Sequence, residues 1–369
     1  MSRIDDFRPD DVTEVGDLFM RVFAKQDGPA SPQLRDYLVR LHFENPSYDP
    51  DRGCLVQRDA ANRVVGFLAG YPLSMRCKGR PLRGVTVGTY MVDPRTQDPF
   101  GALRLVRAFL GRRPDVTFSD TANDVARRIW AGAGVATDRV LSMGWARPLQ
   151  PLRFSLRFWE KPRRRGPALL RGALDRLLRL PDAGINAIER GALEDAARGL
   201  AIRELSAETM AKSAPRVWSN RSLVPDYDRS HLEWMFAALA AKTRYGPLRK
   251  MAVHDGEDRL VGWYIYYPNR GDIGQVVQLA ARPNDYGRVL RHLLLDARSR
   301  GSVGLVGRVD PRHTEDLSGC GCIMFQRQTW TLAHSPDAAA SRALLGHDAM
   351  LSRMEGDWWT RLSANEILG

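Results

Sequence analysis

The sequence predicts an α/β protein of two tandem domains, each a mixed, twisted sheet with helices on both faces. Three observations lead to this fold class. The chain has 369 residues, more than one domain usually holds. Strand patterns alternate with helix patterns, and the order of patterns in the first half returns in the second. The predicted limits are 1–150 for the first domain, 151–200 for a connector and 201–369 for the second domain.

The elements of the first half follow from the spacing of apolar residues and from turn residues. We expect a strand at 4–7, a helix at 13–23, hairpin strands at 54–58 and 63–73, a long strand at 85–92, a helix at 103–110 and a strand at 116–119. Asp59 and Asn62 supply the hairpin turn, and Asp93-Pro94 ends the long strand. Strands and helices in this order favour a mixed sheet covered on both faces.

The second half repeats this order with small insertions, as two diverged copies would. The matching pairs are 4–7 with 202–205, 64–67 with 260–263, and 86–92 with 275–281. Between the copies, residues 161–167 are basic and contain two prolines, which suits an exposed connector. An apolar stripe at 169–178 predicts an amphipathic helix that either packs between the domains or lies on a membrane surface.

Composition limits the function classes. The formal charge of +12 attracts anions such as nucleic acid, anionic lipid, the phosphates of coenzyme A or an acidic carrier protein. An arginine-rich composition that serves no function would give the same positive charge. The acidic start and the absence of a long apolar run predict a cytoplasmic protein without a transmembrane segment. The four scattered cysteines favour a reducing compartment and no metal site.

Several classes lack their motifs. Neither the Gly-x-Ser-x-Gly of serine hydrolases nor the phosphate-binding loop of nucleotide kinases occurs. The basic residues are dispersed and no nucleic-acid-binding motif is present, so nucleic acid is not expected as a partner.

Two segments of the first half carry chemistry. The long strand leads into Gln97-Asp98-Pro99-Phe100-Gly101-Ala102 and then a helix, whose N-terminal amides and dipole favour an anion. The next strand leads into Asn123-x-x-Ala126-x-x-Ile129-Trp130-x-x-x-Gly134. Asn123 either caps this helix or binds a ligand.

Together these segments resemble the GCN5-related N-acyltransferase (GNAT) superfamily. The resemblance implies that the loop with Gln97, Gly101 and Ala102 holds the pyrophosphate of coenzyme A, with Phe100 in place of the first glycine. It implies that Asn123 contacts the pantetheine arm, and that Trp130 replaces the tyrosine that often protonates the leaving thiolate.

The resemblance also implies that backbone amides near Met91 and Val92 polarise the thioester carbonyl. Glu44 and Asp120 are the candidates for the base that accepts the proton of the amine. The second copy has Gly287 and Arg288 in its loop but lacks the Asn-x-x-Ala pattern, so we expect a diverged domain that shapes the acceptor site.

The predicted function is an N-acyltransferase that uses acyl-CoA or acetyl-CoA and a small-molecule or peptide amine, without a metal. Two alternatives stay open: a long-chain acyltransferase with an acidic acyl carrier protein as donor, and a non-catalytic acyl-CoA sensor. The aromatic run 263–267 and Trp358-Trp359 either pack in the core or stack on a ligand.

Overall fold

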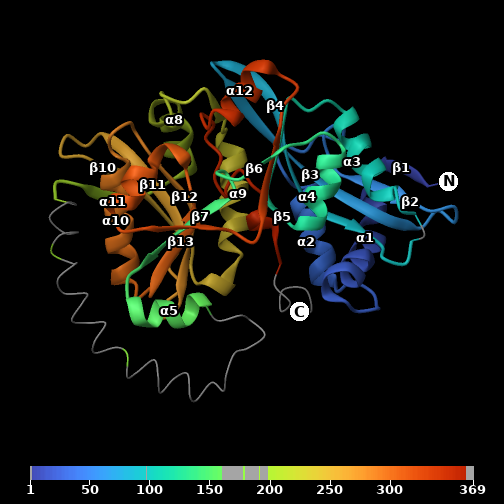
Figure 1. Cartoon of the computed structure of the whole chain (residues 1–369), viewed down its shortest axis with the longest axis horizontal. Helices are drawn as coiled ribbons and strands as arrows, with labels where there is room; N and C mark the ends of the chain where they lie inside the picture. Colours follow the sequence, from blue (N-terminus) through green and yellow to red (C-terminus); the bar gives the residue numbers. More distant parts are fainter. Residues whose placement is uncertain (1, 97, 160–177, 179–190, 192–197, 363–369) are drawn as a thin grey trace. The chain divides into compact units, whose positions relative to one another are not determined.

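The computed structural model describes residues 2–96, 98–159, 178, 191 and 198–362 (Figure 1). Most of the predicted connector and all but the last residue of the apolar stripe at 169–178 lie outside these residues. The chain forms two compact units, neither of which is continuous in sequence. The first unit contains Met1–Ser142, Arg221–Met235 and Arg327–Gly369, and the second contains Met143–Asn220 and Phe236–Gln326.

The first unit is built on one mixed sheet. Its strands, in spatial order, are β1 (Arg3–Asp6), β2 (Leu55–Arg58), β3 (Val64–Cys77), β4 (Arg80–Val92), β5 (Val116–Ala122), β15 (Trp330–His334) and β6 (Thr137–Asp138), with β9 (Leu223–Pro225) paired to β3. Neighbouring strands are antiparallel except β4 and β5, which are parallel.

The second unit repeats this sheet strand for strand. Its order is β8 (Ala201–Glu204), β10 (Arg249–His254), β11 (Leu260–Tyr267), β12 (Ile273–Ala281), β13 (Gly304–Arg308), β7 (Met143–Pro148) and β14 (Ile323–Gln326). Again all neighbours are antiparallel except the fourth and fifth strands, β12 and β13. The predicted fold class, two tandem domains with mixed sheets, is confirmed.

The sixth strand of each sheet comes from the other half of the sequence. β7 pairs with β13 and β14 in the second sheet, although residues 143–148 fall within the predicted first domain. β15 pairs with β5 and β6 in the first sheet. The limits 1–150 and 201–369 therefore remain a prediction about the duplicated sequence, because the spatial units are composed differently.

Helices follow the same strands in both units. In the first unit they are η1 (Pro9–Asp11), α1 (Val12–Phe19), η2 (Met20–Ala24), α2 (Pro32–His42), α3 (Gly101–Gly111), α4 (Asp124–Gly132), α12 (Ala338–Leu345) and η6 (Trp358–Thr360). In the second they are α5 (Pro151–Trp159), α8 (Ala207–Val217), η4 (Thr243–Tyr245), α10 (Tyr286–Ser299), η5 (Pro311–His313) and α11 (Thr314–Gly319), while α9 (Arg229–Ala240) is divided between the units.

The alternation of side chains along β11 shows that helices cover both faces of its sheet. Trp263 meets Trp218 at the end of α8, and Tyr264 stacks on His292 of α10. Successive strand residues point to opposite faces, so α8 and α10 lie on opposite sides. The run 263–267 is fully buried, so these aromatics are core residues and cannot stack on a ligand. No helix within the described ranges is both long and apolar enough to cross a bilayer.

Candidate functional site

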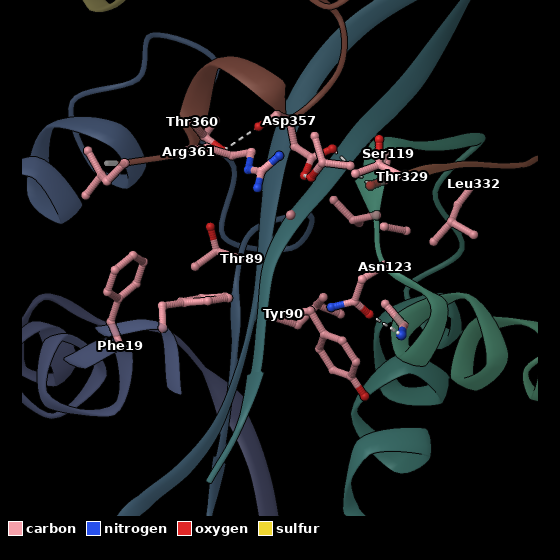
Figure 2. A pocket seen from close by; sticks show the side chains of 18 of the residues that line it. Phe19, Thr89, Tyr90, Ser119, Asn123, Thr329, Leu332, Asp357, Thr360 and Arg361 are labelled. Carbon is pink, nitrogen blue, oxygen red and sulfur yellow. Dashed lines mark hydrogen bonds between the residues drawn. The ribbon is translucent and has the colours of Figure 1, made fainter. Parts of the chain in front are cut away.

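A cavity of about 500 Å³ opens in the first unit where β4 and β5 separate (Figure 2). The two strands pair only from Gly84 to Thr86 of β4. Beyond Thr86 both strands continue, and the cavity is lined by residues 87–90 of β4 and by Ser119, Thr121 and Ala122 of β5. A volume of this size lies within the roughly 300–1,000 Å³ typical of small-molecule sites.

A β-bulge shapes the β4 wall of the cavity. The register between β3 and β4 shifts between Phe67 and Ala69, so Thr89 and Tyr90 face the single residue Leu68. Thr89 has φ +42°, a left-handed conformation that a β-branched residue rarely adopts. Bulges redirect the chain, and strain of this kind gathers at functional sites. The bulge thus turns β4 at the point where it faces the cavity.

Many of the residues that line the cavity are apolar. They include Phe19, Phe23, Ala24, Leu68, Val87, Trp130, Leu332 and Leu362. Phe23 and Ala24 lie in η2, a π-helical turn that continues α1 and ends at Lys25 in the left-handed conformation. Such π turns often occur at functional sites because they change the direction of side chains within a helix.

Asp357 is the buried carboxylate of the cavity (Figure 2). Its Oδ1 accepts hydrogen bonds from the Ser119 hydroxyl and the Asp120 backbone N–H, both at 2.9 Å. Its Oδ2 accepts one from the Thr121 hydroxyl. Burial and then the neighbouring charge of Asp120 raise the pKa of Asp357 to about 6. Asp357 is therefore ionised at neutral pH but close to its titration range, as a general base requires.

Asp120, one of the two predicted base candidates, supports this arrangement from β5. Its side chain is fully buried and is not among the cavity-lining residues. Its Oδ1 accepts a hydrogen bond from the Trp358 backbone N–H at 3.1 Å, and its Oδ2 lies 3.6 Å from the Arg327 guanidinium. The structure therefore places Asp120 behind Asp357 rather than in the cavity.

Two glycines leave room for the side chains of Asp357 and Asp120. A Cβ atom at Gly88 of β4 would lie 2.8 Å from Cβ of Asp357. One at Gly356 would lie 2.2 Å from Oδ1 of Asp120. Either distance is too short for real atoms, so no side chain fits at these positions without moving an aspartate.

Asn123 and Trp130 are the two predicted cofactor-binding residues that line the cavity. The Asn123 Oδ1 caps α4 by accepting a hydrogen bond from the Ala126 backbone N–H at 2.8 Å. Its amide nitrogen points toward β4 (Figure 2). The two sequence interpretations of Asn123 are thus compatible, since one atom caps the helix and another faces the cavity. Trp130 is buried and packs edge to face on Phe109.

Tyr90, which the sequence analysis did not consider, also lines the cavity, and its hydroxyl points away from Thr89 and Ser119 (Figure 2). This hydroxyl is buried and, among the described residues, has no hydrogen-bond partner. Burial raises the pKa of Tyr90 above its usual value, so the hydroxyl stays protonated at neutral pH.

The predicted phosphate loop before α3 holds a carboxylate of the chain itself. Asp98 accepts hydrogen bonds from Ser2, Gln57 and the Phe100 N–H and forms an ion pair with Arg104. Phe100 is exposed, and Gly101 and Ala102 lie in the first turn of α3. None of these three residues lines the cavity, and Gln97 lies outside the described residues.

The remaining predicted site residues also lie away from the cavity wall. Met91 is buried, and Val92 follows it at the end of β4. The β4 residues that line the cavity are instead Val87 to Tyr90. Glu44 is exposed on the turn after α2 and is not a lining residue. Its proposed role as a base remains a prediction.

The corresponding loop of the second unit is also occupied by acidic side chains. Asp285 precedes α10 and pairs with Arg288, and a Cβ at Gly287 would lie 2.8 Å from Oδ1 of Asp316. After β13, a helix does form, α11 with six residues, although the Asn-x-x-Ala pattern is missing.

Another pair with reactive side chains is inert. The Cys54 Sγ lies 3.1 Å from Nδ1 of His42, and both residues are buried. Burial raises the pKa of Cys54 to about 12 and lowers that of His42 to about 3, so neither is charged at neutral pH. Across the part of the chain that the structure describes, no cluster of His, Cys, Asp and Glu could hold a metal ion.

Sequence reasoning considered only Trp358 and Trp359 of the segment 357–362 and missed the four residues of this segment that line the cavity. Asp357, Thr360, Arg361 and Leu362 all line it. Asp357 lies 237 positions from Asp120, whose N–H it binds. A contact over this separation leaves no local pattern in a single sequence. Trp358 and Trp359 are buried, as core residues would be.

The fold is that of the GCN5-related N-acetyltransferases. A GCN5-related N-acetyltransferase from Kribbella flavida has a TM-score of 0.58 at 16% identity, over 93% of this chain and 73% of that one. One from Anabaena variabilis ATCC 29413 has a TM-score of 0.58 at 12% identity, over 93% and 75%. Saccharomyces cerevisiae N-myristoyltransferase, with bound myristoyl-CoA and inhibitors, has a TM-score of 0.51 at 12% identity, over 90% and 79%.

At these identities the similarity establishes the fold alone. No family profile matches the sequence, and no curated protein matches it.

Proposed function

We propose that this protein is an N-acyltransferase that moves an acyl group from a pantetheine thioester, such as acyl-CoA or acetyl-CoA, to an amine. The acceptor is a small molecule or a peptide. The observation that carries this proposal is the cavity between β4 and β5, with the buried carboxylate of Asp357 in its wall. A pantetheine arm is extended and carries amides, so the open edge of β4 and the Asn123 amide suit it.

In this proposal Asp357 accepts the proton of the attacking amine. The amine nitrogen bonds to the thioester carbon, and the carbonyl oxygen becomes an oxyanion. Backbone amides at the Thr89–Tyr90 bulge are the candidates for its stabilisation, in place of Met91 and Val92. The carbon–sulfur bond then breaks and the thiolate leaves. The products are an amide and a thiol.

Tyr90 is our candidate for the group that protonates the leaving thiolate. The indole N–H of Trp130 cannot do so, because it does not ionise in water. Tyr90 lines the cavity, and its buried hydroxyl is protonated at neutral pH and forms no hydrogen bond within the described residues. It can therefore donate to a thiolate without losing an internal partner.

A non-catalytic sensor of acyl thioesters is the competing function. Phe100 and Trp130 favour it, because both depart from the pattern of catalytic members of the superfamily. A sensor would bind the thioester without turnover.

Thiol release separates the two functions. The purified protein is mixed with acyl-CoA or acyl-pantetheine of several chain lengths and a panel of amines, and the freed thiol is measured with a thiol reagent. The four cysteines of the protein are buried and contribute little background. Amine-dependent thiol release that disappears in Asp357→Asn supports the acyltransferase. Tight thioester binding without release for any amine supports the sensor.

A further inference from the structure

The loop before α3 is the place where the fold implies a pyrophosphate, and here a carboxylate fills it. Asp98 accepts hydrogen bonds from the Ser2 hydroxyl and Gln57 amide at 3.2 Å and from the Phe100 N–H at 3.3 Å. It also forms an ion pair with Arg104. The side chain is only 19% exposed. Four donors beside this loop that could meet a phosphate, the Ser2 hydroxyl, the Gln57 amide, the Phe100 N–H and Arg104, are therefore already bound to Asp98.

Asp98 carries a full negative charge at neutral pH. Its burial favours the neutral form, but hydrogen bonds from Arg104, Ser2 and the Phe100 N–H outweigh this and lower its pKa below the usual value. A pyrophosphate placed here would meet this charge at close range, and Arg104 is already neutralised. Like charges at this distance repel strongly when water is partly excluded.

The backbone does not open to a phosphate either. A Cβ at Gly101 would lie 2.7 Å from the Gln57 amide nitrogen and 2.9 Å from Oδ2 of Asp98. The free side of this glycine is thus filled by two side chains of the protein. At the position of the family's first glycine stands Phe100, whose side chain is 65% exposed.

The second unit offers no replacement site in the equivalent loop. Asp285 precedes α10 and pairs with Arg288, and Gly287 faces Asp316. In both units a carboxylate stands where the fold implies a phosphate. In the first unit, by contrast, the cavity that would take the pantetheine arm is lined by apolar or neutral residues except for Asp357 and Arg361.

We infer that the donor is recognised through its acyl group and pantetheine arm alone, and that no nucleotide pyrophosphate binds at α3. This inference rests on the proposed function and narrows its donor class to pantetheine thioesters. If the donor carries a nucleotide, as coenzyme A does, the protein makes no specific contact with that nucleotide. The pantetheine arm of a loaded acyl carrier protein and a small pantetheine thioester share this chemistry.

The test compares octanoyl-pantetheine with octanoyl-CoA on the full-length protein by calorimetry, which needs no acceptor. Salt at about 0.3 M screens the general attraction of the basic protein for the nucleotide phosphates. We expect dissociation constants within about threefold of each other. Octanoyl-CoA binding more than about tenfold tighter would overturn the inference while leaving the proposed function intact. Failure of both thioesters to bind would instead refute the proposed function.

Asp98→Asn supplies the matched variant, since it keeps the shape of the side chain and removes the charge. We expect it to tighten octanoyl-CoA binding by about tenfold and to leave octanoyl-pantetheine binding unchanged. Asp285→Asn in the second unit is the control and should change neither. Equal effects of Asp98→Asn on both thioesters would mean a structural role for Asp98 and contradict the inference. An octanoyl-loaded acyl carrier protein distinguishes the two sources of the pantetheine arm. If it binds more tightly than octanoyl-pantetheine, the donor is a carrier protein.

Discussion

Replacing Asp357 by asparagine tests the proposed base directly. The asparagine keeps an oxygen for the Ser119 hydroxyl and the Asp120 N–H, so the local structure should survive. It cannot accept a proton. We expect amine-dependent thiol release to fall by on the order of 10²–10⁴, the usual contribution of a general base.

The pH dependence of the rate of thiol release tests the role of Asp357 most specifically. The pKa of Asp357 is about 6, so the wild-type rate should rise with pH and level off above that value. Asp120→Asn removes the charge that is the second cause of this shift. The acidic limb should then move to lower pH by about one unit, although Asp120 does not line the cavity. An unchanged limb in Asp120→Asn, or full activity in Asp357→Asn, would refute the reasoning.

Stability provides an independent measurement on the same variant. The folded protein holds the Asp357 proton more tightly than the unfolded chain, because the folded pKa of about 6 exceeds the ordinary aspartate value of 3.8. This stabilisation is complete below the unfolded pKa and is lost as the pH rises through about 6. Asp357→Asn should therefore be more stable than wild type at pH 8, by on the order of 1–3 kcal/mol. The difference should vanish near pH 4 in urea melts.

Substitutions at Tyr90, Asn123 and Gly88 test neighbouring groups. Tyr90→Phe should leave unfolding free energy unchanged to within about 1 kcal/mol, because no internal hydrogen bond is lost. Its thiol release should fall for alkyl thioesters but not for aryl thioesters, whose thiolates leave unprotonated. Asn123→Asp keeps the cap on α4 and should weaken thioester binding in calorimetry, whereas Asn123→Ala should also cost ~1 kcal/mol of stability. Gly88→Ala should displace Asp357 and lower thermal stability by about 1–3 kcal/mol, while Gly132→Ala, near which only Leu103 lies at 3.8 Å, should not.

The strands of the sheet could be predicted from sequence because each strand depends on a local pattern of apolar and turn residues. Alternation in β11 and the turn residues Asp59 and Asn62 depend on neighbours in the chain. The exchange of β7 and β15 between the sheets could not be predicted in this way. A strand carries the same pattern in whichever sheet it pairs, so the choice depends on distant partners.

The candidate site was predictable only where its residues share one motif. Asn123 and Trp130 belong to one helix pattern, and both line the cavity. Asp120 was located close to the site, but the carboxylate in the cavity wall is Asp357 from the far end of the chain. The loop with Phe100 and Gly101 has nearly the expected spacing. Ser2 and Gln57, which are distant in sequence, donate hydrogen bonds to Asp98 of this loop, and the sequence pattern does not show these contacts.

Trp130 and Phe100 depart from the family pattern, and their effect on function can be interpreted only from the residues around them. Trp130 lacks the expected hydroxyl, and a buried hydroxyl stands nearby on Tyr90 of β4 instead. Phe100 lacks the expected open backbone, and a carboxylate from the same loop fills the space that a phosphate would take. The first departure moves a chemical group to another strand, and the second removes a binding subsite. A substitution in a motif therefore does not by itself distinguish an inactive copy from an active one with a different donor.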